Sequence, residues 1–199
     1  MQHDSEFTQQ ESLAVIQEMI NKAKNRFSEG GHLYLLWGWV VFICSLAEFV
    51  LLRFVHYQQH GMIWLLTWVA FIYQLFYLAR KRRQSKVRTY THDIIKYVWL
   101  VFVISMALLM FLFAMIVGPD TYKIIGPVFL VLYGMPSFLS GIILKFKPLV
   151  IGGICCWALA VIAAFVPEDY RLLLLALSML LAWIIPGYML NSKYKKDNA

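Results

Sequence analysis

Charged residues are scarce in this chain. Asp, Glu, Lys and Arg together make up 15% of its 199 residues, whereas soluble globular domains carry about 25%. The hydrophobic share is high, at 61%, and includes fourteen Phe and seven Trp. A water-soluble fold of this size would expose large apolar patches. The composition therefore excludes an ordinary soluble domain and predicts that the chain lies in lipid.

Cysteine and the common catalytic motifs are also rare or missing. Cys44, Cys155 and Cys156 lie inside apolar runs without a CxxC pattern, so neither disulfides nor zinc are predicted. No GxSxG, HExxH or P-loop sequence occurs. The sequence thus predicts a protein that is not an enzyme and takes no cofactor or metal. The polar first thirty residues do not resemble a cleavable signal peptide, so the first apolar segment is expected to act as the insertion signal.

Six apolar segments are long enough, or nearly so, to cross a bilayer as helices, which takes ~20 residues each. They cover residues 33–55, 62–79, 97–117, 124–144, 149–166 and 171–190. Most of the connections are short, so consecutive helices are expected to run antiparallel. The predicted fold is all-α, a polytopic membrane protein with six transmembrane helices in three hairpins.

The positive charges are divided unevenly between the two sides that six crossings define. One side receives fifteen of the eighteen Lys and Arg residues, and the other receives only Arg53, Lys123 and Arg171. Six of the fifteen form one basic loop: Arg80, Lys81, Arg82, Arg83, Lys86 and Arg88. Cytoplasmic loops carry the excess of positive charge, so both termini are predicted to be cytoplasmic. The basic loop is expected to contact anionic lipid headgroups. Nucleic acid is not an expected partner, because so short a loop forms no folded basic module.

Residues 1–32 are predicted to form a cytoplasmic amphipathic helix. Apolar residues recur there at steps of three and four, as Leu13, Ile16, Ile20, Ala23 and Phe27. A helix of this kind lies on the membrane surface, although a short seam against another helix is the alternative. Residues 33–190 then form the transmembrane domain, and residues 191–199 form a basic cytoplasmic tail.

Glu48 is the one acidic residue inside a predicted spanning segment. An ionisable group at that depth costs about 3 kcal/mol, so it must face protein or water. Ser45 shares its helical face, and Thr67 and Gln74 share a face of the next helix. This predicted polar cluster has two interpretations. It could be a proton- or cation-linked site, or Glu48 could be a neutral, hydrogen-bonded clamp between helices; the clamp is preferred, since no buried base accompanies Glu48.

Small residues line one face of the fourth and fifth predicted helices. The two stripes are Gly126, Leu130, Gly134, Ser137 and Gly141, then Gly152, Cys156, Ala160 and Ala163 or Ala164. Such residues let helix backbones approach closely, so a packing role is expected. Pro136 and Pro186 each remove a backbone donor. Together with Gly134 and Gly187 they are the candidate hinge.

His56 and His60 form an HxxxH pattern just outside the first segment. On a helix this spacing points both imidazoles the same way, as a metal site requires. The short loop supplies no carboxylate or cysteine, so we interpret both as exposed loop histidines.

Two sequences, MINKAKNRF at Met19–Phe27 and HLYLLWGW at His32–Trp39, carry a resemblance to known proteins. With the regions Gly141–Gly153 and Ile184–Leu190, they resemble an uncharacterised family of bacterial multi-pass membrane proteins for which no activity is known. The resemblance implies the bacterial inner membrane. A weak internal repeat aligns Trp39–Ala47 with the segment sixty residues later, and would make the first two hairpins related copies.

Two classes of function fit these observations. The first is a non-enzymatic interaction or regulatory subunit that presents its cytoplasmic face to a protein partner or a second copy. The second is a small transporter or channel-forming oligomer that uses Glu48. The first is preferred, because a transport path usually carries more polar residues within the membrane.

Overall fold

The structure, a computed structural model, describes residues 31–57, 59–84, 90–118 and 121–197. Six helices among them are long and apolar enough to cross a membrane, which confirms the number of predicted segments. They are Gly31–Val55, His60–Arg80, Ile94–Val117, Lys123–Ile143, Lys147–Phe165 and Glu168–Ser192. The predicted N-terminal helix lies outside the described residues except for its last two positions. Of the basic loop, Arg80, Lys81, Arg82 and Arg83 lie at the end of the helix Leu65–Gln84, with Arg80 exposed, and Lys86 and Arg88 lie outside the described residues.

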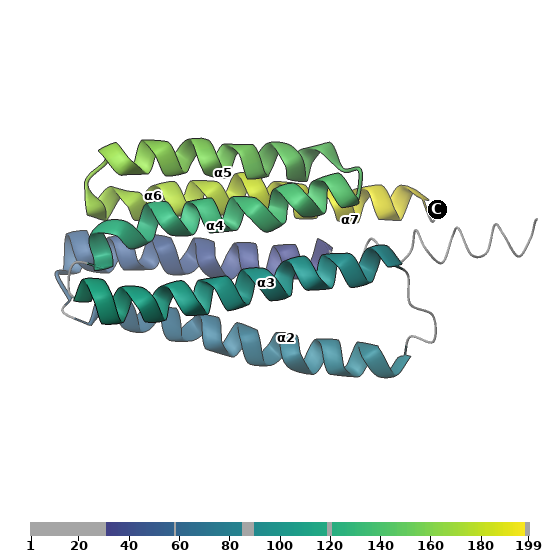
Figure 1. Cartoon of the computed structure of the whole chain (residues 1–199), viewed down its shortest axis with the longest axis horizontal. Helices are drawn as coiled ribbons and strands as arrows, with labels where there is room; N and C mark the ends of the chain where they lie inside the picture. Colours follow the sequence, from purple (N-terminus) through teal and green to yellow (C-terminus); the bar gives the residue numbers. More distant parts are fainter. Residues whose placement is uncertain (1–30, 58, 85–89, 119–120, 198–199) are drawn as a thin grey trace, which may run out of the picture.

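The regular elements of the described residues are all helical, and their long axes run side by side (Figure 1). The first spanning helix, Gly31–Val55, ends in a π-helical turn, η1 (Leu51–Val55). The later elements, in chain order, are η2 (His60–Trp64, a 3-10 helix), α2 (Leu65–Gln84), α3 (Tyr90–Leu112), η3 (Phe113–Val117), α4 (Thr121–Ile143), α5 (Lys147–Phe165), α6 (Glu168–Met179), η5 (Leu180–Ile184) and α7 (Ile185–Asp197). Residues 191–197 of the predicted tail therefore continue the last helix.

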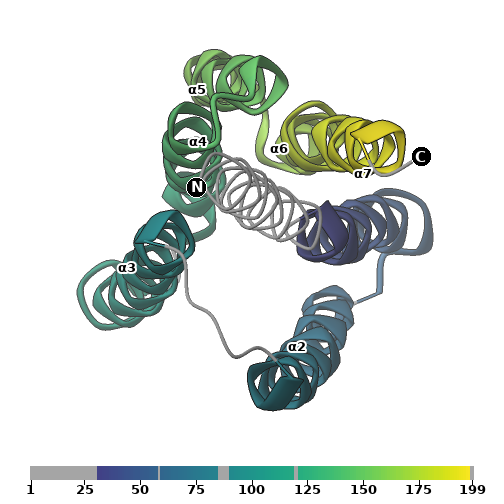
Figure 2. The ribbon, with the colours of Figure 1, turned by 90° about the vertical axis from the view of Figure 1, so that its right-hand side faces the viewer.

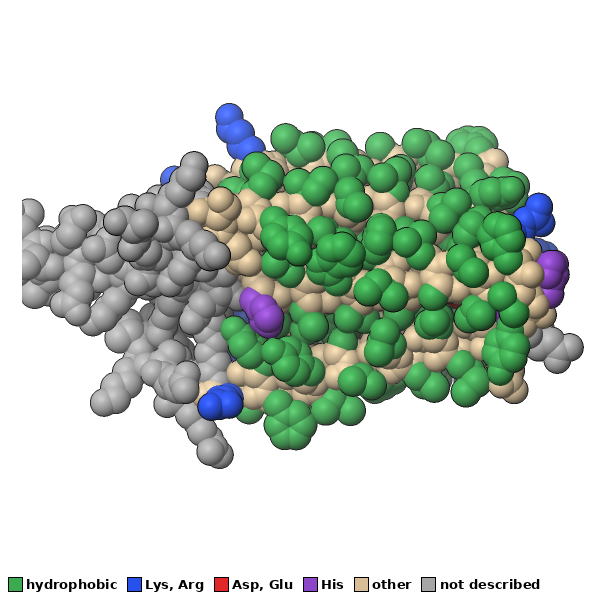
Figure 3. Space-filling view, turned by 180° about the vertical axis from the view of Figure 1, so that it is seen from behind, with side chains coloured by type: hydrophobic (Ala, Val, Ile, Leu, Met, Phe, Trp, Pro, Cys, Tyr) green, Lys and Arg blue, Asp and Glu red, His purple; other side chains and the backbone are tan. Residues whose placement is uncertain are grey.

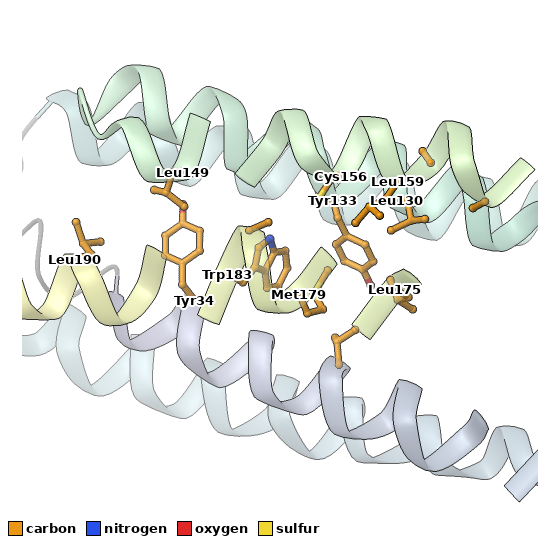
Figure 4. Close-up of a cluster of buried hydrophobic side chains, with 14 of the residues drawn as sticks. Tyr34, Leu130, Tyr133, Leu149, Cys156, Leu159, Leu175, Met179, Trp183 and Leu190 are labelled. Carbon is orange, nitrogen blue, oxygen red and sulfur yellow. The ribbon is translucent and has the colours of Figure 1, made fainter. Parts of the chain in front are cut away.

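A cluster of aromatic side chains forms the centre of the core. Trp183 of η5 is almost fully buried, and its ring lies edge-on to Tyr34 of the first spanning helix, Trp99 of α3 and Tyr133 of α4, with centroids 5.3–6.4 Å apart. Figure 4 shows Tyr34, Trp183 and Tyr133 in one row between the helices. Edge-to-face pairs contribute about 0.5–1.5 kcal/mol each beyond burial. Four elements far apart in sequence thus meet at one tryptophan.

Glycines bring α4 and α5 into close contact. A Cβ added at Gly134 would lie 3.0 Å from the backbone oxygen of Gly153, and one added at Gly153 would lie 2.9 Å from that of Gly134. Backbones this close leave no room for side chains and gain dispersion contacts along their length. Gly153, which lies against α4, is not part of the predicted α5 stripe, whereas Gly152 of that stripe faces Ala182 of η5. Of the two alternatives at the end of the stripe, Ala163 is buried and Ala164 is exposed.

The two candidate hinge prolines do not interrupt the helical backbone. α4 runs without a break through Pro136. Pro186 follows the π-helical turn η5, in which the backbone N–H of Ile185 donates to the carbonyl of Leu180, five residues back. A π turn accommodates the donor that proline lacks. Gly134, Pro136, Pro186 and Gly187 are all buried, so the candidate hinge lies within packed structure.

The two halves of the bundle differ in how tightly they pack. Viewed end-on, the first spanning helix, α4, α5 and α6–α7 lie on one side, with α2 and α3 on the other (Figure 2). In the most apolar windows of the spans, half of the residues are buried in Glu168–Ser192, but only 6% in the α2 span and none in the α3 span. Hydrophobic side chains cover the flank between the two ends of the molecule (Figure 3). A flank of this kind is suited to lipid or to other transmembrane helices.

Candidate functional site

Glu48 lies on the buried face of the first spanning helix and is only 7% exposed. Its Oε2 accepts a hydrogen bond of 2.6 Å from the indole Nε1 of Trp64, and its Oε1 lies 2.9 Å from Nδ1 of His60. With Nδ1 protonated, the imidazole donates to the carboxylate. Both oxygens of the one buried carboxyl group among the described residues are therefore occupied. His60 is partly exposed, with 27% of its side chain accessible.

The turn between the first two spans places these partners beside Glu48. The first spanning helix ends where His56 adopts a left-handed conformation, with φ of 53°. A backbone hydrogen bond of 3.2 Å from the N–H of His60 to the carbonyl of Tyr57 then starts η2. His60 and Trp64 are the first and last residues of η2, and the side chains of both reach Glu48 on the first spanning helix.

The predicted polar cluster is not brought together as one site. The Thr67 hydroxyl donates to the carbonyl of Trp64 on its own helix, at 2.5 Å. Gln74 accepts a hydrogen bond from the indole N–H of Trp37, well away from Glu48 along the helix. The hydroxyl oxygen of Ser45 is buried and has no hydrogen-bond partner. The structure thus places Glu48 with two residues outside the predicted set.

Side-chain polar contacts join α2 and the first spanning helix at several levels. One helical turn before Glu48, the thiol of Cys44 points at the carbonyl oxygen of Ile63, 3.6 Å away. Further toward the N-terminal end of the first spanning helix, Trp37 donates its hydrogen bond to Gln74 of α2. Near the other end, the His32 ring lies against Tyr77, with centroids 5.2 Å apart. These contacts form a polar ladder between the first spanning helix and the helix His60–Gln84.

His60 and Trp64 are partners of Glu48 that the sequence did not identify, and His60 is a partly buried residue of η2 instead of the exposed loop histidine that was expected. The HxxxH pattern drew attention to His60, but its carboxylate partner stands twelve residues earlier in the chain rather than in the loop. His56 is exposed, as predicted, and makes no contact with Glu48. Within the described ranges, no three His, Cys, Asp or Glu side chains gather in a way that could hold a metal ion.

A separate apolar groove of about 470 Å³ lies on the flank of the first spanning helix. Its lining consists of Ile43, Leu46, Ala47, Val50, Leu51 and Ile63. Glu48 is not part of this lining, so the groove gives the carboxylate no path to solvent.

Comparisons with known proteins return nothing for this chain: no protein-family model, curated protein or solved structure matches it. The function of the protein is therefore inferred from its residues and their geometry.

Proposed function

We propose that this protein is a non-enzymatic interaction or regulatory subunit of the bacterial inner membrane. Its six spans form three antiparallel hairpins, and both termini face the cytoplasm. The division of fifteen basic residues against three supports this orientation. The basic loop, with Arg80 at its start, lies against anionic lipid headgroups on the cytoplasmic side.

The observation that carries this proposal is the exposure of α3. Its span is the most apolar of the six, with a mean hydropathy of 3.0, yet none of the residues in that window is buried. Val101, Ile104 and Leu108 are 49–61% exposed. Transmembrane helices associate by van der Waals packing between such surfaces. We infer that α3 packs against a transmembrane helix of another protein or of a second copy.

The geometry around Glu48 supports a structural role for this residue. Both carboxylate oxygens are bound within the first hairpin, by His60 and Trp64. A carboxyl group bound on both oxygens is suited to clamping two helices, which was the preferred interpretation of the sequence. If Glu48 is structural, the protein acts through its membrane-embedded contact surface on α3.

Photo-crosslinking in native membranes tests the contact surface. A photoreactive residue at Val101 or Leu108 of α3 should give a discrete protein adduct. The same residue at Ile151 or Val161 of α5, which are 60% and 64% exposed, is the matched control and should label lipid only. Two differently tagged copies of the chain distinguish a second copy from another protein. The proposal fails if the α3 positions yield no protein adduct.

A small transporter or channel-forming oligomer is the second candidate, favoured by the carboxylate–imidazole contact itself. Glu48 and His60 could exchange a proton near one end of the bundle, and His60 is accessible from solvent. Purified protein in liposomes with an imposed potential should then carry a proton or cation current that Glu48→Gln abolishes. A wild-type protein that carries no current above empty liposomes rules out this role.

A further inference from the structure

Pro127 lies inside α4 and removes one donor from the helical backbone. In a regular helix, the N–H of residue 127 would donate to the carbonyl of Lys123, four residues earlier. Proline has no N–H, so the Lys123 carbonyl loses its usual helical partner. Transmembrane helices tolerate proline where a side chain or a neighbouring helix supplies a donor instead. The carbonyl of Lys123 is therefore a place to look for such a donor.

Arg171 of α6 donates to this carbonyl from a different helix. Its guanidinium Nη1 donates to the backbone oxygen of Lys123, and its Nε donates to the backbone oxygen of Val166 at 2.9 Å. Val166 is the residue at which α5 ends, on extended backbone. The start of α4, the end of α5 and the start of α6 lie at the same end of the bundle (Figure 1). One side chain therefore joins three helices.

The residue before Pro127 accommodates the stem of Arg171. A Cβ added at Gly126 would lie 3.4 Å from both Cβ and Cδ of Arg171, so the stem of the arginine packs directly over this glycine. Arg171 is partly buried. Two consecutive residues of α4 thus fit the arginine in different ways: Gly126 makes room for its stem, and Pro127 leaves a carbonyl for its guanidinium.

We propose that Arg171 replaces the donor that Pro127 removes and acts as a latch that holds the ends of α4, α5 and α6 together. A guanidinium suits this task, because its N–H donors form a rigid planar fork that can serve two acceptors at once. A lysine has no donor at the position of Nε. Arg171 is also one of only three basic residues on the side that the charge count predicts to be non-cytoplasmic. Its bonds to two carbonyls give this charge a structural task.

A double-mutant cycle between Arg171→Met and Pro127→Ala tests the latch by denaturant titration of the full-length protein in bicelles. Methionine keeps an unbranched stem over Gly126 but has no donor. Arg171→Met should therefore lower the unfolding midpoint when Pro127 is present. Pro127→Ala gives the Lys123 carbonyl a helical donor of its own. In that background Arg171→Met should lower the midpoint by only about half as much, because the bond to Val166 alone is lost.

Arg53→Met is the matched control, because it removes an exposed arginine from the same predicted side of the protein. Its effect should be the same in both backgrounds.

The dependence on Pro127 decides the outcome. If Arg171→Met lowers the midpoint as much or more in the Pro127→Ala background, Arg171 does not replace the missing donor. If it lowers the midpoint in neither background, Arg171 is not a latch. An Arg171→Met protein that folds only together with Pro127→Ala is rescued by the restored N–H, which supports the proposal. Failure to fold in both backgrounds would mean that an N–H at position 127 replaces nothing that Arg171 supplies, and would refute it.

Discussion

Removal of the Glu48 carboxylate gives the sharpest test of the clamp. Glu48→Ala leaves the Trp64 indole N–H and the His60 imidazole without their acceptor. Hydrogen bonds between side chains in membrane proteins contribute about 0.6–1.7 kcal/mol each, so losing two should cost about 1–3 kcal/mol of unfolding free energy. Glu48→Gln keeps one carbonyl oxygen as acceptor and should cost about half as much. The expected order of stability is wild type, then Gln, then Ala.

The assay is a denaturant titration that unfolds the purified protein in bicelles and gives its free energy of unfolding. Ser45→Ala serves as the matched control, because it alters a neighbouring buried position on the same helix face whose hydroxyl has no partner. This control should not destabilise the protein. A double-mutant cycle with Trp64→Phe isolates the shorter of the two hydrogen bonds, and a coupling energy of about 1 kcal/mol is expected.

Two results would refute this reasoning. If Glu48→Ala unfolds at the same denaturant concentration as the wild type, the carboxylate contributes nothing to the hairpin. If Glu48→Ala and Trp64→Phe add without coupling, the two side chains do not interact in the folded protein. In either case Glu48 would be buried for a reason other than clamping.

The remaining predictions concern packing, the polar ladder and topology. Gly153→Ala should destabilise the protein by about 1–3 kcal/mol, because the new methyl overlaps the α4 backbone; Gly61→Ala, where an added Cβ meets nothing within 4 Å, is the control for the same unfolding assay. Gln74→Leu removes the acceptor of a tryptophan N–H and should cost about 1 kcal/mol in that assay; no loss would contradict the ladder. In a cysteine-free variant, Gln59→Cys and Lys145→Cys should react with an impermeant thiol probe from opposite sides of sealed vesicles, and labelling from one side would disprove the topology.

The spans and the buried face of the first helix could be predicted because both depend on local pattern. Hydropathy over about twenty residues is sufficient to identify a membrane-crossing helix. The 3.6-residue period placed Ser45 and Glu48 on one face, and both are buried. The small-residue stripes identified packed faces in part: Gly134 and Gly141 of α4 lie against α5, whereas Gly152 of α5 lies against Ala182 of η5.

The partners of Glu48 could not be predicted, because they depend on how the chain reverses direction. The sequence grouped Glu48 with Thr67 of a second helix that was expected to begin at residue 62. In the structure, helical backbone already begins at His60, so Trp64 lies opposite Glu48 and Thr67 bonds its own backbone instead. Threonine in a helix often does so, since its hydroxyl reaches the preceding turn. No periodicity in the sequence encodes a left-handed residue at His56 followed by a 3-10 turn.

The bundle therefore combines two kinds of attachment with different consequences. α4 and α5 meet backbone to backbone at Gly134 and Gly153, and such a contact tolerates almost no displacement. α2 is attached through a few polar side chains spaced along its length, and individual hydrogen bonds can break one at a time at about 1 kcal/mol each. We therefore expect α2 to shift relative to the first spanning helix more easily than α4 shifts relative to α5. If α3 packs against a partner, as proposed, that partner would contact the half of the molecule whose spans are least buried.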